Sequence, residues 1–454
     1  MLYTALRFLS VCSEAVWQSA RFVGVSVWYL MTAPKDAKVR IQALGGRCFT
    51  DFFKNLGATF IKIGQILSAR PDVLPAWMIE ELQTLQDQVP PFGFTAVRTA
   101  VESDLGCPLE DVFAEFEQEP IAGASVSQVH KARLADGEVV AVKVRRPGIA
   151  NTMRRDLSII SGVSRFVDLL PGMSNIGLTR MSKEFAKKIQ AQLDFPLEVR
   201  NNKRFEENLS DFEFARVPHI HEELCGPNVI TMEFIEGKKL SDILDNPPID
   251  PAVMAERMID IYLSMAFRDF FVHADLHPGN MLIDHEGNYV LLDTGLVHEV
   301  PEHYAKKFIR LYMSMMTMNA ELIVDTYLDN AEVRPPSIED AIRDTNALVE
   351  KYQDISFSDF EIGKGLVEIM TILRRHRIYL DAELTGFFLS EITFEGVAKM
   401  LDGSLDLVNV IPGKIPAIAG GLSFIDADDP VLVALNERVA NDEGVRAMLN
   451  RRAG

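Results

Sequence analysis

The 454 residues are 48 % apolar and 24 % charged, proportions typical of a globular protein with a substantial core. The formal net charge of −19 argues against a nucleic-acid binder, because such proteins need a basic footprint. The charge is uneven, since residues 1–50 hold six Lys/Arg and two Asp/Glu, a local charge of +4. Four scattered cysteines without a CxxC pair argue against disulfides and structural zinc and indicate a reducing compartment.

Residues 2–31 are predicted to form one amphipathic helix. Its polar residues recur near the helical period, and the rest of its surface is apolar and includes Trp17 and Trp28. Two interpretations stay open: a helix buried against the body of the protein, or a helix on an anionic membrane surface. No run of about 18 apolar residues exists that would predict a transmembrane helix. We expect a cytoplasmic protein that could associate peripherally with the inner face of a membrane.

The middle of the chain changes from helical to strand-like patterns and back. The stretch "SVSQVHKARLADGEVVAVKV" (125–144) alternates like two strands joined at Asp136-Gly137, a strong hairpin signal. The overall order predicts an α+β, two-lobed fold with a ligand cleft between its lobes. The other predicted elements are helices over 51–90, 150–170 and 178–209, a strand over 228–237, and a mostly helical region over 240–405 around a loop at 273–298.

The stretch "FFVHADLHPGNMLID" (270–284) carries the strongest chemical signal. Asp275 and Asn280 have the D-x-x-x-x-N spacing of a kinase catalytic loop. Asp293 begins "DTG" after an apolar run, where a kinase places Asp-Phe-Gly. "VAVK", which ends at Lys143, matches the strand motif that carries the phosphate-binding lysine of kinases. Three such motifs in the right order predict phosphoryl transfer from ATP.

Each of these residues has an expected role in the chemistry of phosphoryl transfer. Lys143 is expected to hold the α- and β-phosphates, and Asn280 and Asp293 offer the hard oxygen ligands that Mg²⁺ prefers. Asp275 is expected to take a proton from an acceptor or to orient a nucleophile.

Two other points of the pattern have alternatives. His273 and His277 are four residues apart and could ligate a metal on a helix, but the neighbouring Pro-Gly argues against a helix there, and a third ligand is not evident. A glutamate is needed to hold the lysine, and the helix predicted over 178–209 offers both Glu184 and Glu198.

The segment before the lysine differs from a glycine-rich kinase loop. "PIAGASVSQVH" (120–130) supplies alanines and the single glycine Gly123. Alanine disfavours the positive-φ conformations that glycine permits, so this loop is expected to be stiffer than its kinase counterpart.

With these motifs together, residues 50–405 resemble the UbiB family of atypical, protein-kinase-like proteins. The similar stretches are "FIKIGQ" with "LSARPDVLP" and "LQDQVPP", the alanine-rich loop, "QLDFPLEVRNN", "TMEFIEGKKLSD" and "HADLHPGN". The resemblance implies a protein-kinase-like fold whose helical N-terminal KxGQ extension lies across the cleft and occludes protein substrates. It also implies an ATPase or small-molecule kinase that supports isoprenoid-quinone or lipid metabolism at membranes, so an isoprenoid or phenolic lipid is an expected partner.

The resemblance assigns residues and segments. Glu198 matches the glutamate that pairs with the lysine, and Asp194 matches the last residue of the family's ExD motif. The other nucleotide-binding residues are expected to be Ala122, Gly123, Ala124, Ser125, Lys62, Gln65, Glu233 and Ile235. The expected segments are an amphipathic region (1–50), the KxGQ extension (51–115), a β-rich N-lobe (116–236), a helical C-lobe (237–405) and a tail (406–454).

Three departures from the family pattern leave a second function open. Gln192 replaces the first acidic residue of ExD, Thr294 replaces the phenylalanine of Asp-Phe-Gly, and Gly123 interrupts the alanines. Gln192 and Thr294 favour a nucleotide-binding pseudoenzyme that serves as a lipid- or partner-binding switch, whereas the intact Lys143, Asp275, Asn280 and Asp293 favour an enzyme. Gly123 is expected to relax the loop towards that of an ordinary kinase. An ordinary protein kinase is a third interpretation, but no clear Ala-Pro-Glu segment follows Thr294.

Overall fold

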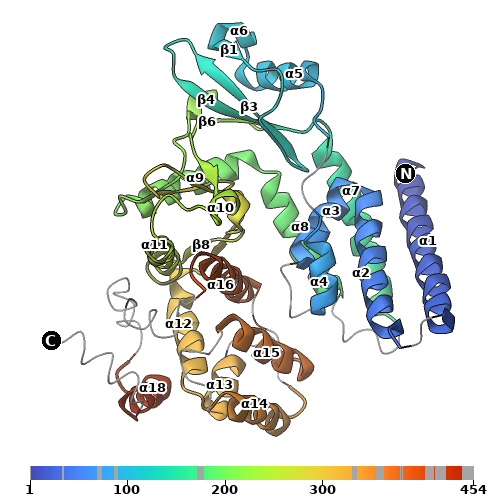
Figure 1. The fold of residues 1–454 in the computed structure, drawn as a ribbon, viewed down its shortest axis with the longest axis vertical. Coiled ribbons are helices and arrows are strands. Elements are labelled where there is room, and N and C mark those ends of the chain that lie inside the picture. Colours follow the sequence, from blue (N-terminus) through green and yellow to red (C-terminus); the bar gives the residue numbers. More distant parts are fainter. Residues whose placement is uncertain are drawn as a thin grey trace. The chain divides into compact units, whose positions relative to one another are not determined.

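The computed structural model describes residues 2–32, 35–68, 74–85, 90–170, 178–329, 335–353, 362–378, 380, 382–403, 414 and 426–441. The chain divides into two compact units (Figure 1). Unit 1 consists of Met1–Lys203 and Pro218–Ile235, and unit 2 of Arg204–Val217 and Glu236–Gly454. Most of the segment that the sequence sets apart as a tail, 406–454, lies outside the described residues.

Unit 1 combines helices with an antiparallel sheet in the order β1-β3-β4-β6, with β2 added on β3. The strands are β1 (Phe113–Phe116), β2 (Ala122–Gly123), β3 (Ser127–Leu134), β4 (Val139–Arg145) and β6 (Val229–Glu233). The helices are α1 (Leu2–Thr32), α2 (Ala37–Leu56), α3 (Ala58–Ser68), α4 (Ala76–Leu82), α5 (Phe94–Leu105), α6 (Leu109–Val112), α7 (Ile149–Asp168), α8 (Leu178–Gln192), α9 (Phe195–Leu209) and the short η2 (Glu222–Leu224).

The β3–β4 hairpin forms as the sequence predicts. Gly137 has φ +97° and closes the turn, a conformation that glycine adopts without the strain a side chain would add. The valines of β4 at 140, 142 and 144 are fully buried and pack with Val97 and Val101 of α5. The valines thus anchor one face of β4 in the core between the sheet and α5.

Helix α1 packs on the rest of unit 1 with its polar side. Arg7 forms an ion pair with Asp156 of α7 at 2.8 Å, and Arg21 forms one with Asp51 of α2 at 2.6 Å. Gln18 is 6 % exposed, whereas Trp17 is 63 % exposed. The other large apolar side chains that α1 exposes are Leu6, Phe8, Leu9, Val16, Val23, Val27, Trp28, Leu30 and Met31. Helix α1 therefore packs against the body of the protein, as one of the two interpretations expects, and Val11 reaches the core cluster, but most of the large apolar side chains of α1 stay exposed.

Unit 2 is mainly helical. Its helices are α10 (Leu240–Ile243), α11 (Pro251–Leu263), η3 (Ser264–Arg268), η4 (Pro278–Asn280), α12 (Glu302–Met316), α13 (Ala320–Leu328), α14 (Ile338–Gln353), α15 (Ile362–Arg375), α16 (Ala382–Leu401) and α18 (Pro430–Asn441). Its strands are β5 (Ala215–Arg216), β7 (Lys238–Lys239), β8 (Phe271–His273), β9 (Met281–Ile283), β10 (Tyr289–Leu291) and β11 (Val297–Glu299).

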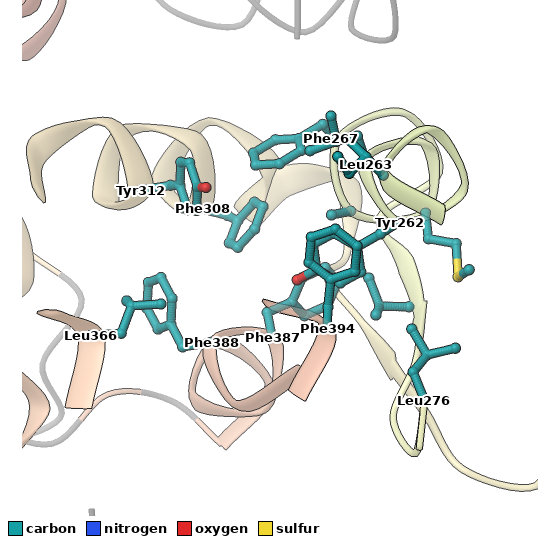
Figure 2. Packing of buried hydrophobic residues seen from close by; sticks show 14 of the residues in the cluster. Tyr262, Leu263, Phe267, Leu276, Phe308, Tyr312, Leu366, Phe387, Phe388 and Phe394 are labelled. Atoms are coloured by element: carbon teal, nitrogen blue, oxygen red, sulfur yellow. The ribbon is translucent and has the colours of Figure 1, made fainter. Parts of the chain in front are cut away.

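An aromatic core holds the helices of unit 2 together. Tyr262 of α11 stacks on Phe394 of α16, with ring centres 4.1 Å apart, and Phe308 of α12 meets Phe387 edge-on (Figure 2). Such aromatic pairs add specific geometry to the burial of large apolar area. Within the described residues, no helix is both long enough and apolar enough to cross a membrane.

Candidate functional site

Lys143 forms a buried ion pair with Glu198. Lys143 lies on β4, between β3 and β6, and its Nζ lies 2.6 Å from Glu198 Oε1 on α9. Both side chains are at most 10 % exposed, and Nζ lies 5.6 Å from the centre of the Phe195 ring. A buried lysine needs such a counter-charge, because an unpaired charge in the interior is costly. Of the two glutamates that the sequence offers, Glu198 pairs with the lysine, and Glu184 pairs with Arg180.

Glu198 is placed by a helix that begins just before it. The sequence predicts one helix over 178–209, and this prediction is wrong, because the chain forms α8 and α9 with two residues between them. The Asp194 carboxylate accepts a 3.0 Å hydrogen bond from the Leu197 N–H and so caps α9. This cap satisfies one of the free donors of the first helical turn. The predicted nucleotide residue Asp194 thus positions the helix that carries Glu198.

Gln192 and Asp194 have different surroundings. Asp194 is exposed, whereas Gln192 ends α8 and is 7 % exposed. Within the described part of the chain, Gln192 Oε1 is buried without a hydrogen-bond partner. A buried acceptor of this kind costs free energy, so the position is poorly satisfied as it stands.

The alanine-rich loop places a hydroxyl in the interior. Ala122 and Gly123 form β2, which pairs with β3, and the Ala124 N–H donates to the Ser127 carbonyl. Ser125 is 1 % exposed, and its Oγ finds no partner among the residues that the structure describes. A ligand atom that reached Ser125 would satisfy this group.

The "KIGQ" residues (62–65) lie on α3 and join the helical extension. Gln65 Nε2 donates a 2.9 Å hydrogen bond to the carbonyl of Leu85. A Cβ added at Gly64 would overlap Leu85 Cδ1, so glycine permits this close packing. Lys62 is 9 % exposed and forms no ion pair with any described residue. Gly64 and Gln65 therefore have a structural role, and contact of Lys62 or Gln65 with a nucleotide stays a prediction.

The predicted nucleotide residues Glu233 and Ile235 lie at the end of β6. Glu233 exchanges hydrogen bonds with His219: its N–H donates to the His219 carbonyl at 2.8 Å, and its carboxylate accepts from the His219 N–H at 3.3 Å. Ile235 is half-buried and is the last residue of unit 1. The Glu233 carboxylate thus orders the backbone beside the strand.

In unit 2, His273 joins the loop that carries Asp275 to the chain that precedes Asp293. Its Nδ1 accepts a 3.1 Å hydrogen bond from the Asp275 N–H, and its Nε2 lies 2.9 Å from the Leu292 carbonyl. A backbone donor on one nitrogen and a backbone acceptor on the other require the neutral ring with hydrogen on Nε2. Burial lowers the pKa of His273 and favours this neutral form.

Asn280 closes the same loop. Its Nδ2 donates to the Asp275 carbonyl at 3.0 Å, which leaves Oδ1 as the acceptor atom of the amide. The Leu292 N–H donates to the Asn280 carbonyl at 2.8 Å. Asp293 follows with φ +53°, a left-handed conformation that aspartate tolerates better than most residues. Unit 2 thus brings Asp275, Asn280 and Asp293 into one hydrogen-bonded loop system, with Thr294 buried behind it.

His277 also has a structural role. Its Nδ1 accepts a 3.0 Å hydrogen bond from the Gly279 N–H, at the start of η4. Across the described ranges, no group of three or more His, Cys, Asp or Glu residues is placed to hold a metal. Sequence reasoning missed that both histidines of the loop serve its backbone, and the neighbouring Pro-Gly was the one local sign of a turn.

Two family models match the chain. Residues 84–327 match the ABC1 atypical kinase-like domain, which spans more than half of the 454 residues. Residues 345–406 match the UbiB helical domain, which includes α15 and α16.

Curated relatives and a solved structure agree with these matches. The chain is 32 % identical over 365 residues to a probable protein kinase UbiB of Pseudomonas aeruginosa, covering 78 % of this chain and 68 % of the relative. It is 31 % identical over 437 residues to an uncharacterized protein in the hydrogenase 1 5′ region of Clostridium pasteurianum, covering 91 % and 79 %. The Mycobacterium tuberculosis protein Rv3197, solved with erythromycin, is similar with TM-score 0.50 and 25 % identity over 75 % of this chain and 88 % of that one. This chain belongs to the ABC1/UbiB family of atypical kinase-like proteins and has its α+β kinase-like fold.

Proposed function

We propose that this chain is an ATP- and Mg²⁺-dependent kinase or ATPase of the UbiB type that acts in isoprenoid-quinone or lipid metabolism rather than on proteins. The observation that carries the proposal is the buried ion pair between Lys143 and Glu198 on the central strand. The Glu198 carboxylate holds the Lys143 ammonium group in a fixed, buried position. Because the effective dielectric constant is lower there than in water, the ammonium group would attract phosphate oxygens more strongly.

The residues present fit a magnesium nucleotide. Ser125 Oγ, in the loop before β3, is a buried polar atom that lacks a partner in the described structure. Asn280 Oδ1 and the Asp293 carboxylate are hard oxygen donors. Protein sites commonly hold Mg²⁺ through one or two such residues together with phosphate oxygens, so a larger cluster of ligands is not required.

Each residue then has a role. Lys143 holds the α- and β-phosphates, while Asn280 and Asp293 hold the metal ion. Asp275 accepts a proton from the acceptor group or orients it, and His273 keeps the backbone of Asp275 in place. When bound, Mg·ATP supplies the transferable phosphoryl group and neutralises part of its charge.

A thermal-shift experiment tests the metal ligands. Mg·ATP at 100 times its dissociation constant should stabilise the wild type by about 2.7 kcal/mol. Asp293→Asn should abolish the Mg²⁺-dependent part of this shift without changing the melting temperature of the free chain. Asp325→Asn, at an exposed position on α13, is the matched control and should keep the full shift. A full shift in Asp293→Asn would show that the metal assignment is wrong.

The alternative function is a nucleotide-binding pseudoenzyme that serves as a lipid- or partner-binding switch. Two observations favour it: Thr294 is 2 % exposed where kinases have phenylalanine, and Gln192 has an unsatisfied buried oxygen. Phosphate release, measured with and without lipid vesicles and phenolic additives, separates the two functions. Turnover that Asp275→Asn removes supports the enzyme, whereas nucleotide binding without turnover in any condition supports the switch.

We further propose that α1 binds an anionic membrane surface. Its exposed side is apolar and includes Trp17 and Trp28, because its polar side contacts α2 and α7. A contiguous apolar surface of this kind usually marks an interaction site. The local charge of +4 over residues 1–50 suits anionic lipid headgroups.

Tryptophan fluorescence tests the membrane proposal. Two of the three tryptophans lie on the exposed side of α1, so vesicles that contain phosphatidylglycerol should shift the emission to shorter wavelength. Val16→Asp should weaken the binding, and deletion of residues 1–31 should remove it. Val433→Asp on α18, an exposed valine within unit 2, is the control. Unchanged sedimentation of the truncated chain with vesicles would contradict the proposal.

A further inference from the structure

Unit 1 contains a cavity of about 500 Å³ that the proposed function does not use. It lies where β4 ends, between α7, the end of α8 and the start of α9. Its volume falls in the range of roughly 300–1,000 Å³ that small-molecule sites occupy. Neither Lys143 nor Glu198 lines it, so it is separate from the ion pair that carries the proposed function.

One wall of the cavity is Arg145, whose charge is not balanced by a direct partner. Arg145 donates to the Leu193 carbonyl at 2.6 Å and to Asn228 Oδ1, and both acceptors are neutral. No described carboxylate lies within ion-pair distance of it. Burial lowers the pKa of Arg145, since its guanidinium is partly desolvated.

The lining of the cavity includes a second arginine. Arg154 of α7 is exposed towards solvent and donates at 3.0 Å to Asn151 Oδ1 on its own helix. It too forms no ion pair within the described residues. The carboxylate that lines the cavity belongs to Asp194, which already caps α9. The residues that line the cavity therefore include two guanidinium groups and one carboxylate, and the Asp104 carboxylate lies behind Asn228 near Arg145.

The rest of the lining is mainly apolar. Leu157 of α7, Leu193, Pro196 and Pro227 supply hydrophobic surface beside the two guanidinium groups. A site of this composition suits a ligand with a charged head and a hydrophobic body.

We propose that this cavity binds a small phosphate monoester with an apolar organic group. Guanidinium groups bind phosphate oxygens through paired N–H donors, and a phosphate would supply a direct anionic partner to two arginines that form no ion pair with a described residue. The organic group lies on the leucine and proline surface, where its burial adds affinity in proportion to its apolar area.

Titration calorimetry with n-hexyl phosphate tests the site, with inorganic phosphate and n-hexanol as separate arms. No nucleotide is added, so the result does not depend on the proposed function. We expect one site per chain for hexyl phosphate, with affinity at least tenfold higher than for either part alone. If inorganic phosphate binds as tightly as hexyl phosphate, or if the wild type does not bind hexyl phosphate, the proposal is wrong.

Three variants locate the binding. Arg154→Gln should weaken the binding of hexyl phosphate about tenfold, because it removes one of the two guanidinium groups. The fold should not change, since the hydrogen bond of Arg154 is to Asn151 on its own helix. Ala150→Leu, which adds volume inside the cavity and keeps both arginines, should also weaken it. Arg165→Gln, exposed on the same helix but outside the cavity, is the control and should bind as the wild type does. Circular dichroism melts verify that each variant is folded. Unchanged affinity in both Arg154→Gln and Ala150→Leu would place the ligand elsewhere, for example on the apolar side of α1, and would overturn the proposal.

Discussion

The backbone N–H of Asp275 donates a 3.1 Å hydrogen bond to the ring of His273. The same ring bonds to the Leu292 carbonyl, one residue before Asp293. Since His273 is fully buried, water cannot replace either bond. One neutral imidazole therefore fixes the backbone beside both aspartates of the candidate site in unit 2.

His273→Leu should lower the free energy of unfolding by about 1–3 kcal/mol for each backbone group that it leaves buried and unpaired. It should also reduce phosphate release, because the Asp275 backbone loses its support. Urea unfolding followed by circular dichroism measures the first effect. His285→Leu, at an exposed position in the β9–β10 turn, is the control and should leave both properties unchanged. A fully stable His273→Leu protein would contradict the structural role.

The buried pair of Lys143 and Glu198 should show strong energetic coupling. Lys143→Met leaves a buried carboxylate and Glu198→Leu leaves a buried ammonium, and each change should cost about 3–5 kcal/mol of stability. The double variant should be far more stable than the sum of the two losses predicts, because neither charge then stays unpaired. Urea unfolding of the four proteins measures the coupling. Additive losses would mean that the pair does not form in solution.

Glu391 should make the stability of unit 2 depend on pH. It lies fully buried on α16, hydrogen-bonded to Tyr262, and burial raises its pKa to about 8. Between about pH 5 and pH 8 the folded chain keeps a proton that the unfolded chain has lost. The free energy of unfolding should therefore fall by about 1.4 kcal/mol per pH unit as the pH rises through this window.

Glu391→Gln replaces the carboxyl with an amide that does not titrate, so it should remove this dependence of the free energy of unfolding on pH. Denaturant unfolding at pH 5.5, 6.5 and 7.5 measures it, and comparison with the wild type cancels the contributions of other groups. Glu350→Gln, at an exposed position on α14, is the matched control and should keep the slope. Equal slopes in wild type and Glu391→Gln would show that this carboxyl is ionised in the folded chain.

Gly64→Ala and Gly24→Ala should change stability in opposite directions. A Cβ at Gly64 would overlap Leu85, and overpacking of this kind typically costs about 1–3 kcal/mol. At Gly24 on α1, no described atom lies within 4 Å of the added Cβ, so alanine should stabilise by about 0.5–1 kcal/mol through helix propensity. Leu85→Ala should rescue part of the loss in the Gly64→Ala chain. Urea unfolding followed by tryptophan fluorescence measures these changes, with Trp77 on α4 as a signal within unit 1. Equal effects of Gly64→Ala and Gly24→Ala on the free energy of unfolding would contradict the packing argument.

The sequence alone was sufficient for features that depend on local spacing. The Asp136-Gly137 turn between alternating runs predicted the β3–β4 hairpin, and the fold class and the family followed from the order of the motifs. The hairpin and each single motif are encoded within a few residues, because turn geometry and strand alternation need no distant partner, and the order of the motifs along the chain then indicates the fold class and the family. The roles of Lys143, Asp275, Asn280 and Asp293 in catalysis stay predictions.

The tertiary structure decided what depends on contacts between distant segments. It selected Glu198 rather than Glu184, because the two-residue break before α9 aims that helix at β4, 55 positions away in the chain. It also turned the polar side of α1 inwards, because Arg21 and Arg7 of α1 form ion pairs with Asp51 on α2 and Asp156 on α7. A helical pattern shows which residues share a face, but the partner that covers this face is set by long-range packing, which no local pattern contains.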